Sequence, residues 1–228
     1  MAMAAPWATI MATGIFISMA EDRLLLWQWL SPAFPIGAFA YSQGLEQPMA
    51  TGAVRNIADV EAWVTTTLRF GSPRMDAIFL AQARAGADPD LLSDLLLSYA
   101  TCPERETELL DQGRAFAALI GTITGKTVSI RPYPVAVGLA TRALDVPTEE
   151  VLSLFLHGAA AQMISAATRF LPLGQSESQA LLSRLAPLFT QLATEAATAS
   201  LDDIATFTPG ADMAAMRHET LEVRIFRT

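Results

Sequence analysis

The 228-residue sequence predicts an all-α fold, a single-domain helical bundle of about eight to ten helices. Three observations support this prediction: apolar residues recur at helical spacing, proline and glycine mark helix ends at short intervals, and strand-like alternation hardly occurs. A chain of this length can bury roughly 70–75% of its unfolded surface without a disulfide or metal staple. We expect residues 21–228 to form the domain. Residues 1–20 are apolar but lack the basic start of a signal peptide, and we expect a disordered extension there.

Residues that favour helix ends mark five helices in the first half of the chain. Asn56 can accept hydrogen bonds from a first helical turn, and Gly71 and Gly86 suit helix C-termini. Proline loses no hydrogen bond in a first helical turn, whereas the residue before Pro32 is disfavoured in the α conformation. These signals predict helices over residues 24–30, 56–70, 72–86, 88–99 and 103–123.

An uncharged apolar helix is predicted near the centre of the second half. A shorter helix follows the turn at 131–134 and runs to about Leu144, and Thr148 then opens a helix that contains the uncharged stretch Val151–Thr168. That stretch could span a membrane by length alone. Its serine, histidine, glutamine and threonine side chains would be costly in lipid, so we expect a buried central helix instead.

The last predicted helix begins at a capping box, the S-x-x-Q pattern of residues 176–179. Pro187 should kink or split this helix because it has no N–H to donate. Beyond Ser200 the pattern is irregular, and we expect a flexible tail over about residues 205–228.

Charge and cysteine content exclude several classes of protein. The net charge is −8, the pI is near 4.7, and Lys126 is the one lysine. An acidic chain without a basic run is a poor candidate for binding nucleic acid or an anionic membrane. Cys102 is the single cysteine, so an intramolecular disulfide is impossible and a reducing, cytoplasmic location fits best.

The sequence at residues 121–127 is similar to a phosphate-binding loop: Gly-Thr-Ile-Thr-Gly-Lys-Thr. The motif requires four residues between its glycines and a preceding strand, whereas this stretch has three and follows a predicted helix. We therefore expect no nucleotide site there.

Ser42 lies in an A-x-S-x-G pattern at residues 40–44, which is similar to the nucleophile motif of hydrolases. A nucleophile elbow needs a strand before it, an upstream oxyanion loop and a downstream histidine base. Pro32 and Pro35 make a poor central strand, and His157 and His218 are the two histidines available. A small serine hydrolase that uses Ser42 is therefore the weaker alternative reading of the sequence.

Metal-ligand spacing is absent from the sequence. Two histidines and one cysteine lie far apart, and no loop carries the alternating acidic pattern of a calcium site. We expect no metal site within the chain, while a transient site at a dimer interface stays open.

Five elements in order resemble the urease accessory protein UreF family. The first is S-P-A-F-P-I-G-A-F-A-Y-S-Q-G-L-E at residues 31–46, which we call the signature segment. The others are Q-G-R at 112–114, Y-P-V-A-V-G at 133–138, L-P-L-G-Q at 171–175, and M-R-H-E followed by R-I-F-R-T at 216–228. Tyr133 stands where the family commonly has histidine, and Ile225 and Thr228 are conservative departures.

The resemblance implies an all-α assembly factor that is not an enzyme. Members of the family form homodimers and join the accessory protein UreD, called UreH in some organisms. That complex recruits the GTPase UreG to urease apoprotein, so that nickel is inserted into the metallocentre. By resemblance, this chain binds neither nickel nor GTP itself, because its partners handle both.

The resemblance also names candidate residues for partner binding, at both ends of the chain. In the signature segment, Phe39 and Tyr41 are equally well read as interface aromatics or as core. Glu46 fits a capping or paired carboxylate somewhat better than a group that guides a cation. The basic and apolar C-terminus could dock through Phe226 and its arginines, or could be a frayed tail. The candidates are Pro35, Gly37, Phe39, Tyr41, Ser42, Glu46, His218, Glu219, Arg224, Phe226 and Arg227.

Overall fold

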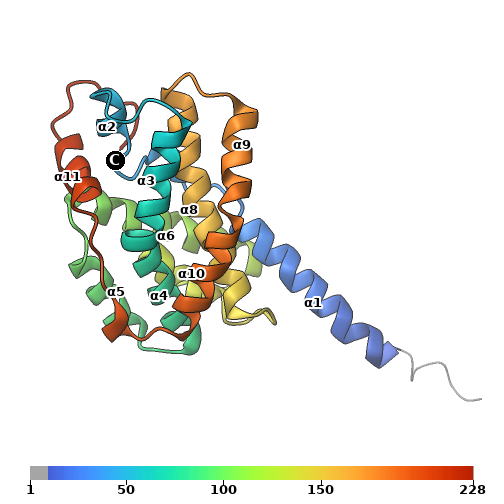
Figure 1. Cartoon of the computed structure of the whole chain (residues 1–228). Coiled ribbons are helices and arrows are strands. Elements are labelled where there is room, and N and C mark those ends of the chain that lie inside the picture. The colour runs from blue at the N-terminus through green and yellow to red at the C-terminus, as the bar shows by residue number, and fades with distance from the viewer. Residues whose placement is uncertain (1–9, 228) are drawn as a thin grey trace, which may run out of the picture.

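The computed structural model describes the backbone of residues 10–227 and the side chains of residues 19–227. It confirms the all-α prediction: helices pack side by side into one bundle, and no strand occurs in residues 10–227 (Figure 1). The α-helices are α1 Ile10–Trp29, α2 Glu46–Ala50, α3 Ile57–Phe70, α4 Ser72–Ala85, α5 Pro89–Ser98, α6 Pro103–Thr124, α7 Tyr133–Thr141, α8 Thr148–Phe170, α9 Gln175–Arg184, α10 Ala186–Thr198 and α11 Pro209–His218. Short 3₁₀ helices are η2 Ala38–Ala40 and η3 Leu201–Asp203.

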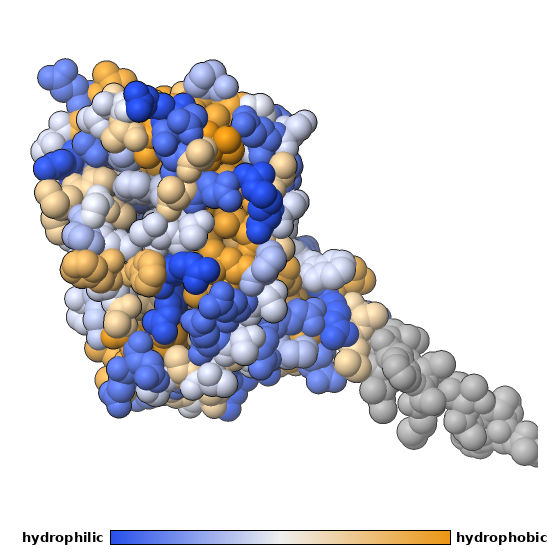
Figure 2. Space-filling view, viewed as in Figure 1, coloured by the Kyte–Doolittle hydropathy of each residue, from blue (hydrophilic) through white to orange (hydrophobic). Residues whose placement is uncertain are grey.

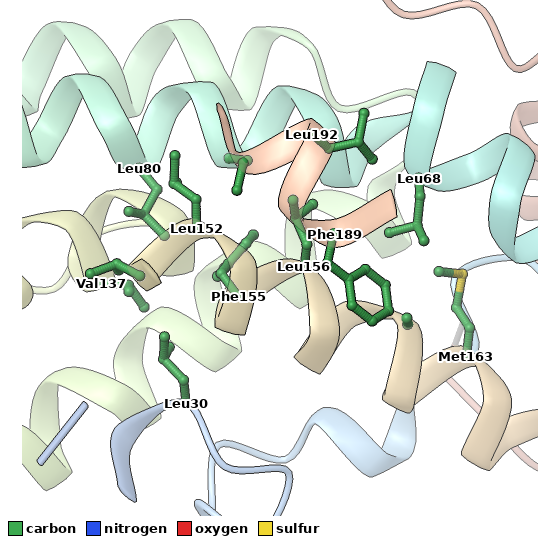
Figure 3. Close-up of a cluster of buried hydrophobic side chains, with 14 of the residues drawn as sticks. Leu30, Leu68, Leu80, Val137, Leu152, Phe155, Leu156, Met163, Phe189 and Leu192 are labelled. Carbon is green, nitrogen blue, oxygen red and sulfur yellow. The ribbon is translucent and has the colours of Figure 1, made fainter. Parts of the chain in front are cut away.

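Helix α8 lies at the centre of the bundle, as the sequence predicts. It packs against α3, α4, α9 and α10. Leu152 and Leu156 are fully buried, and Figure 3 shows the α8 side chains meeting Leu80 of α4 and Phe189 of α10. Of the described helices, α8 has the length and apolar composition to cross a membrane, and half of that stretch is buried inside the protein. Burial against other helices accounts for its apolar sequence.

Two glycines of the family-like elements allow helices to approach closely. A Cβ at Gly138 of α7 would lie 2.5 Å from the Leu80 carbonyl oxygen of α4. A Cβ at Gly113 of α6 would lie 1.9 Å from the Arg131 carbonyl oxygen. No side chain fits at either distance, so these positions require glycine for packing rather than for backbone flexibility.

Several predicted helix ends are confirmed. The Asn56 side chain accepts hydrogen bonds from the N–H groups of Ala58 and Asp59, at 2.9 and 3.1 Å. Gly86 ends α4 in the left-handed conformation with a φ of 99°. The helix around Pro187 is split, since α9 ends at Arg184 and α10 begins at Ala186.

The predicted capping box at residues 176–179 is wrong. Helix α9 begins two residues earlier than a cap at Ser176 requires, at Gln175 with Gly174 as its N-cap, and the Ser178 N–H donates to the Gly174 carbonyl at 3.0 Å. Ser176 therefore lies inside the first turn, where its side chain cannot cap the helix. A capping box forms instead at Ser200, whose N–H and hydroxyl both donate to Asp203 at 2.8 Å.

The two ends of the chain differ from the expectation. The expected irregular chain beyond Ser200 is wrong for residues 209–218, because Pro209 opens helix α11. At the other end, α1 continues back to Ile10 and projects from the bundle (Figure 1). Residues 10–20 are thus helical in the structure, and residues 1–9 lie outside the described part of the chain. The disorder that we expect for residues 1–20 in solution stays a prediction.

Candidate functional site

The C-terminus docks on the signature segment, beside α2 (Figure 1). We call residues 219–227 the strap. Glu46, the last residue of the signature segment, is 1% exposed and accepts two successive strap N–H groups. Its Oε1 accepts from Ile225 at 2.7 Å and its Oε2 from Phe226 at 2.9 Å. One buried carboxylate therefore joins the signature segment to the C-terminal strap.

A chain of ionisable groups continues from Glu46 through His218. The His218 ring is fully buried, with Nε2 lying 2.9 Å from Glu46 Oε2 and Nδ1 lying 2.8 Å from Glu104 Oε2. Arg224 of the strap donates to the other Glu104 oxygen at 3.0 Å. These contacts fix α11 and the strap to α2 and α6, because each of these ionisable side chains has a hydrogen-bond partner on another segment.

Phe226 anchors the strap in the protein. Its side chain is 4% exposed, and the Arg169 guanidinium carbon of α8 lies 4.6 Å from its ring centroid, a cation–π arrangement. The next residue, Arg227, donates its N–H to the Ala40 carbonyl at 2.7 Å. Its guanidinium donates to Asp111 of α6 at 3.4 Å. The terminus that we expected to be flexible is held by main-chain, ionic and aromatic contacts in the structure; its mobility in solution stays a prediction.

A second polar cluster lies beneath the signature segment. Arg105 of α6 donates to Asp76 of α4 and, at 2.7 Å, to Glu108. The other Glu108 oxygen accepts from Gln112 and Gln162, both at 3.0 Å. Burial raises the pKa of Asp76, although the neighbouring Arg105 opposes that shift. Gln112, the glutamine of the Q-G-R element, is therefore part of this buried hydrogen-bond network.

The structure shows where the aromatic and acidic candidates of the signature segment lie. Phe39 is 72% exposed, whereas Tyr41 is buried and its hydroxyl donates to Asp111 at 3.3 Å. Burial also raises the pKa of Tyr41. Gly37 has a φ of 79°, a left-handed conformation that lets the chain turn into η2. Glu46 is the paired structural carboxylate.

The candidate residues therefore fall into two groups. Tyr41, Ser42, Glu46, His218 and Phe226 are buried and hold the site together, while Pro35, Phe39, Glu219, Arg224 and Arg227 are exposed and Gly37 is intermediate. Their roles in partner binding stay predictions.

Ser42 lacks the setting of a hydrolase nucleophile. It is fully buried, and its hydroxyl oxygen accepts the Glu46 N–H at 3.1 Å. A nucleophile elbow instead presents its serine at a surface that substrate can reach. The hydroxyl supports the start of α2, where the signature segment ends.

Three residues of the site were missed by the sequence analysis: Glu104, Asp111 and Arg169. Each contacts the strap from a helix more than fifty positions away in the sequence, and no local pattern marks it. Among the residues that the structure describes, no group of three or more histidine, cysteine or acidic side chains is placed to hold a metal ion.

His157 packs against Phe189 rather than beside Ser42, with ring centroids 5.7 Å apart. Burial lowers its pKa from the ordinary 6.5, so the folded state binds this proton less readily than the unfolded state. We expect the free energy of unfolding to fall as the pH drops from about 7.5 to about 5.5, because the unfolded state gains the proton first. Urea unfolding across this range should show a shallower pH dependence for His157→Gln. Equal slopes for both proteins would contradict this origin.

Known proteins match this chain along most of its length. The UreF family model matches residues 54–186. A urease accessory protein UreF of Cereibacter sphaeroides (strain ATCC 17025) is 53% identical over 210 residues, which is 92% of this chain and 100% of that protein. Proteins of the same name from Jannaschia sp. (strain CCS1) and Paracoccus denitrificans (strain Pd 1222) are 46% and 48% identical, over 96% and 93% of this chain and 100% and 99% of their own.

The fold and the site, together with these relatives, define a class: an all-α accessory protein that is not an enzyme. Its buried polar side chains hold its own terminus in place rather than surround a substrate. The chain belongs to the UreF family. This membership supports a role in urease maturation, together with partners that take part in that process.

Proposed function

We propose that this protein is an assembly factor that forms a complex with UreD, called UreH in some organisms, and recruits the GTPase UreG to urease apoprotein. It acts as a homodimer in the cytoplasm and helps nickel to be inserted into the metallocentre. Nickel and GTP are handled by its partners, and it binds neither nucleic acid nor membrane. Family membership supports the process, and the acidic charge and single cysteine support the location and the absence of nucleic acid.

The observation that carries this proposal is the docked strap, which places exposed groups of both chain ends on one surface. The Arg227 N–H donates to the carbonyl of Ala40, the residue after Phe39, so the backbones of Arg227 and Phe39 lie close together, and both side chains are exposed. Ile225, which is 62% exposed, precedes the buried Phe226. An exposed aromatic next to arginine is the composition of protein–protein hot spots. We call Phe39, Ile225 and Arg227 the docking face.

The proposal is tested by co-expressing the chain with a urease operon that lacks its own UreF. Restored urease activity supports the assembly role, and activity that does not return counts against it. Deleting the strap would not test the docking face alone, because the strap also covers Glu46 and His218. Single exposed side chains are the better targets.

We expect Phe39→Asp to reduce co-purification of UreD or UreH at least tenfold, a loss of about 1.4 kcal/mol or more. The reason is that an exposed aromatic of the docking face is replaced by a charge. Phe207→Asp is the matched control, because Phe207 is 80% exposed and lies between η3 and α11, outside the docking face. Equal co-purification of the Phe39 variant and the wild type would remove Phe39 from the interface.

A further inference from the structure

An unpaired carboxylate oxygen lies in the interior, beneath the signature segment. Asp76 is 5% exposed, and Arg105 donates to its Oδ2. Its Oδ1 makes no hydrogen bond with any of the described residues. The Nε–H of Arg105 likewise has no acceptor in that part of the chain. A buried polar atom without a partner is destabilising, and more so when it is charged, so two such atoms in one ion pair need an explanation.

Both residues line one cavity of about 60 Å³. The cavity is lined by the first half of the signature segment, including Pro32, Phe34 and Ile36. Gln112 and Gln162 also line it. A water molecule needs about 10–15 Å³ of such space, so the cavity of about 60 Å³ has room for roughly four to six. Empty cavities in proteins are apolar, whereas this one has an acceptor, a donor and two side-chain amides in its lining.

A second cavity of about 60 Å³ lies on the other side of Arg105, under α11. Arg105, Gln43 and Leu109 line both cavities, while Asp212 and Ala215 of α11 line only this one. The Asp76–Arg105–Glu108 cluster therefore lies between two spaces rather than in a closely packed core.

We propose that the cavity beneath the signature segment is a hydration site, in which ordered water donates to Asp76 Oδ1 and accepts from Arg105 Nε–H. A water molecule can do both at once, and a water in such a site typically makes about three hydrogen bonds. Burial disfavours the charged form of Asp76 and so raises its pKa. A water molecule that donates to Oδ1 offsets part of this desolvation. The signature segment then packs over a hydrated ion cluster, and its Phe34 and Ile36 line the same cavity as Asp76 and Arg105. This hydration is a property of the isolated chain and does not depend on the proposed function.

A crystal structure of the full chain at about 1.8 Å or better tests the proposal, since buried waters with three hydrogen bonds are well ordered at that resolution. We expect water density within hydrogen-bond distance of Asp76 Oδ1 in the wild type. A cavity without density, or a protein donor turned onto Oδ1, would overturn the proposal.

Two variants sharpen the test in solution. Water-to-amide cross-relaxation measured by NMR should be strong at the side-chain amides of Gln112 and Gln162 in the wild type. Asp76→Asn keeps a polar group of the same shape and should retain most of that signal, whereas Asp76→Leu should lose most of it. Should the leucine variant fail to fold, the wild type and the asparagine variant still decide: absence of the signal in both overturns the hydration site.

Discussion

Replacing Glu46 with alanine should lower the free energy of unfolding by about 3 kcal/mol, because a buried hydrogen-bond donor left without its acceptor costs about 1–3 kcal/mol. The carboxylate accepts the Ile225 and Phe226 N–H groups and faces the His218 ring, all within 2.9 Å. Its removal leaves these groups buried without an acceptor. Urea unfolding followed by circular dichroism measures the loss.

Glu222→Ala is the matched control, because Glu222 is an exposed carboxylate of the same strap. It should leave the free energy of unfolding unchanged. Glu46→Gln should fall between the two, since the amide oxygen can still accept one strap N–H. A Glu46→Ala variant as stable as the Glu222→Ala control would show that the strap is not held in solution as it is in the structure.

Hydrogen exchange gives the same experiment a local measurement. The amides of Ile225 and Phe226 should be protected in the wild type and in Glu222→Ala, because each donates to a buried carboxylate. In Glu46→Ala, the protection of these two amides should fall to the level of the Val223 amide, which belongs to an exposed residue of the strap. Unchanged protection would assign the docking of the strap to Phe226 and Arg227 alone.

Replacing Gly113 with alanine should destabilise the fold by about 3 kcal/mol or more, at the upper end of overpacking costs. The added methyl carbon would lie 1.9 Å from the Arg131 carbonyl oxygen and 3.0 Å from the Tyr133 nitrogen. Both obstacles are backbone atoms, so no side-chain rotation relieves the clash. The segment before α7 must move away from α6.

Gly210→Ala is the control for Gly113→Ala. Gly210 lies in the first turn of α11, and a Cβ there has nothing within 4 Å. Alanine has the higher helix propensity, so this variant should be unchanged or more stable by up to about 1 kcal/mol. Thermal unfolding of the two variants separates a packing role from a general effect of losing glycine. Equal melting temperatures would show that the α6 contact yields easily.

Local chemistry explains which helix ends could be predicted. Asn56, Gly86 and Pro187 act on their own turns, through a side-chain cap, a left-handed φ and a missing N–H. The capping box at residues 176–179 failed for a related reason. The S-x-x-Q pattern occurs near the start of α9, but the turn closes on Gly174, so the pattern falls inside the helix.

The sequence by itself determined the helical class, the buried central helix and the family, because these depend on periodicity and on ordered motifs within short windows. Only the tertiary structure decided what Glu46 does. Its partners Ile225 and Phe226 lie at the other end of the chain, and Glu104 and Arg169, which complete the site, carry no local signal. Side chains that meet across so many residues are brought together by the packing of α2, α6, α8 and α11, and spacing along the sequence does not encode such a meeting.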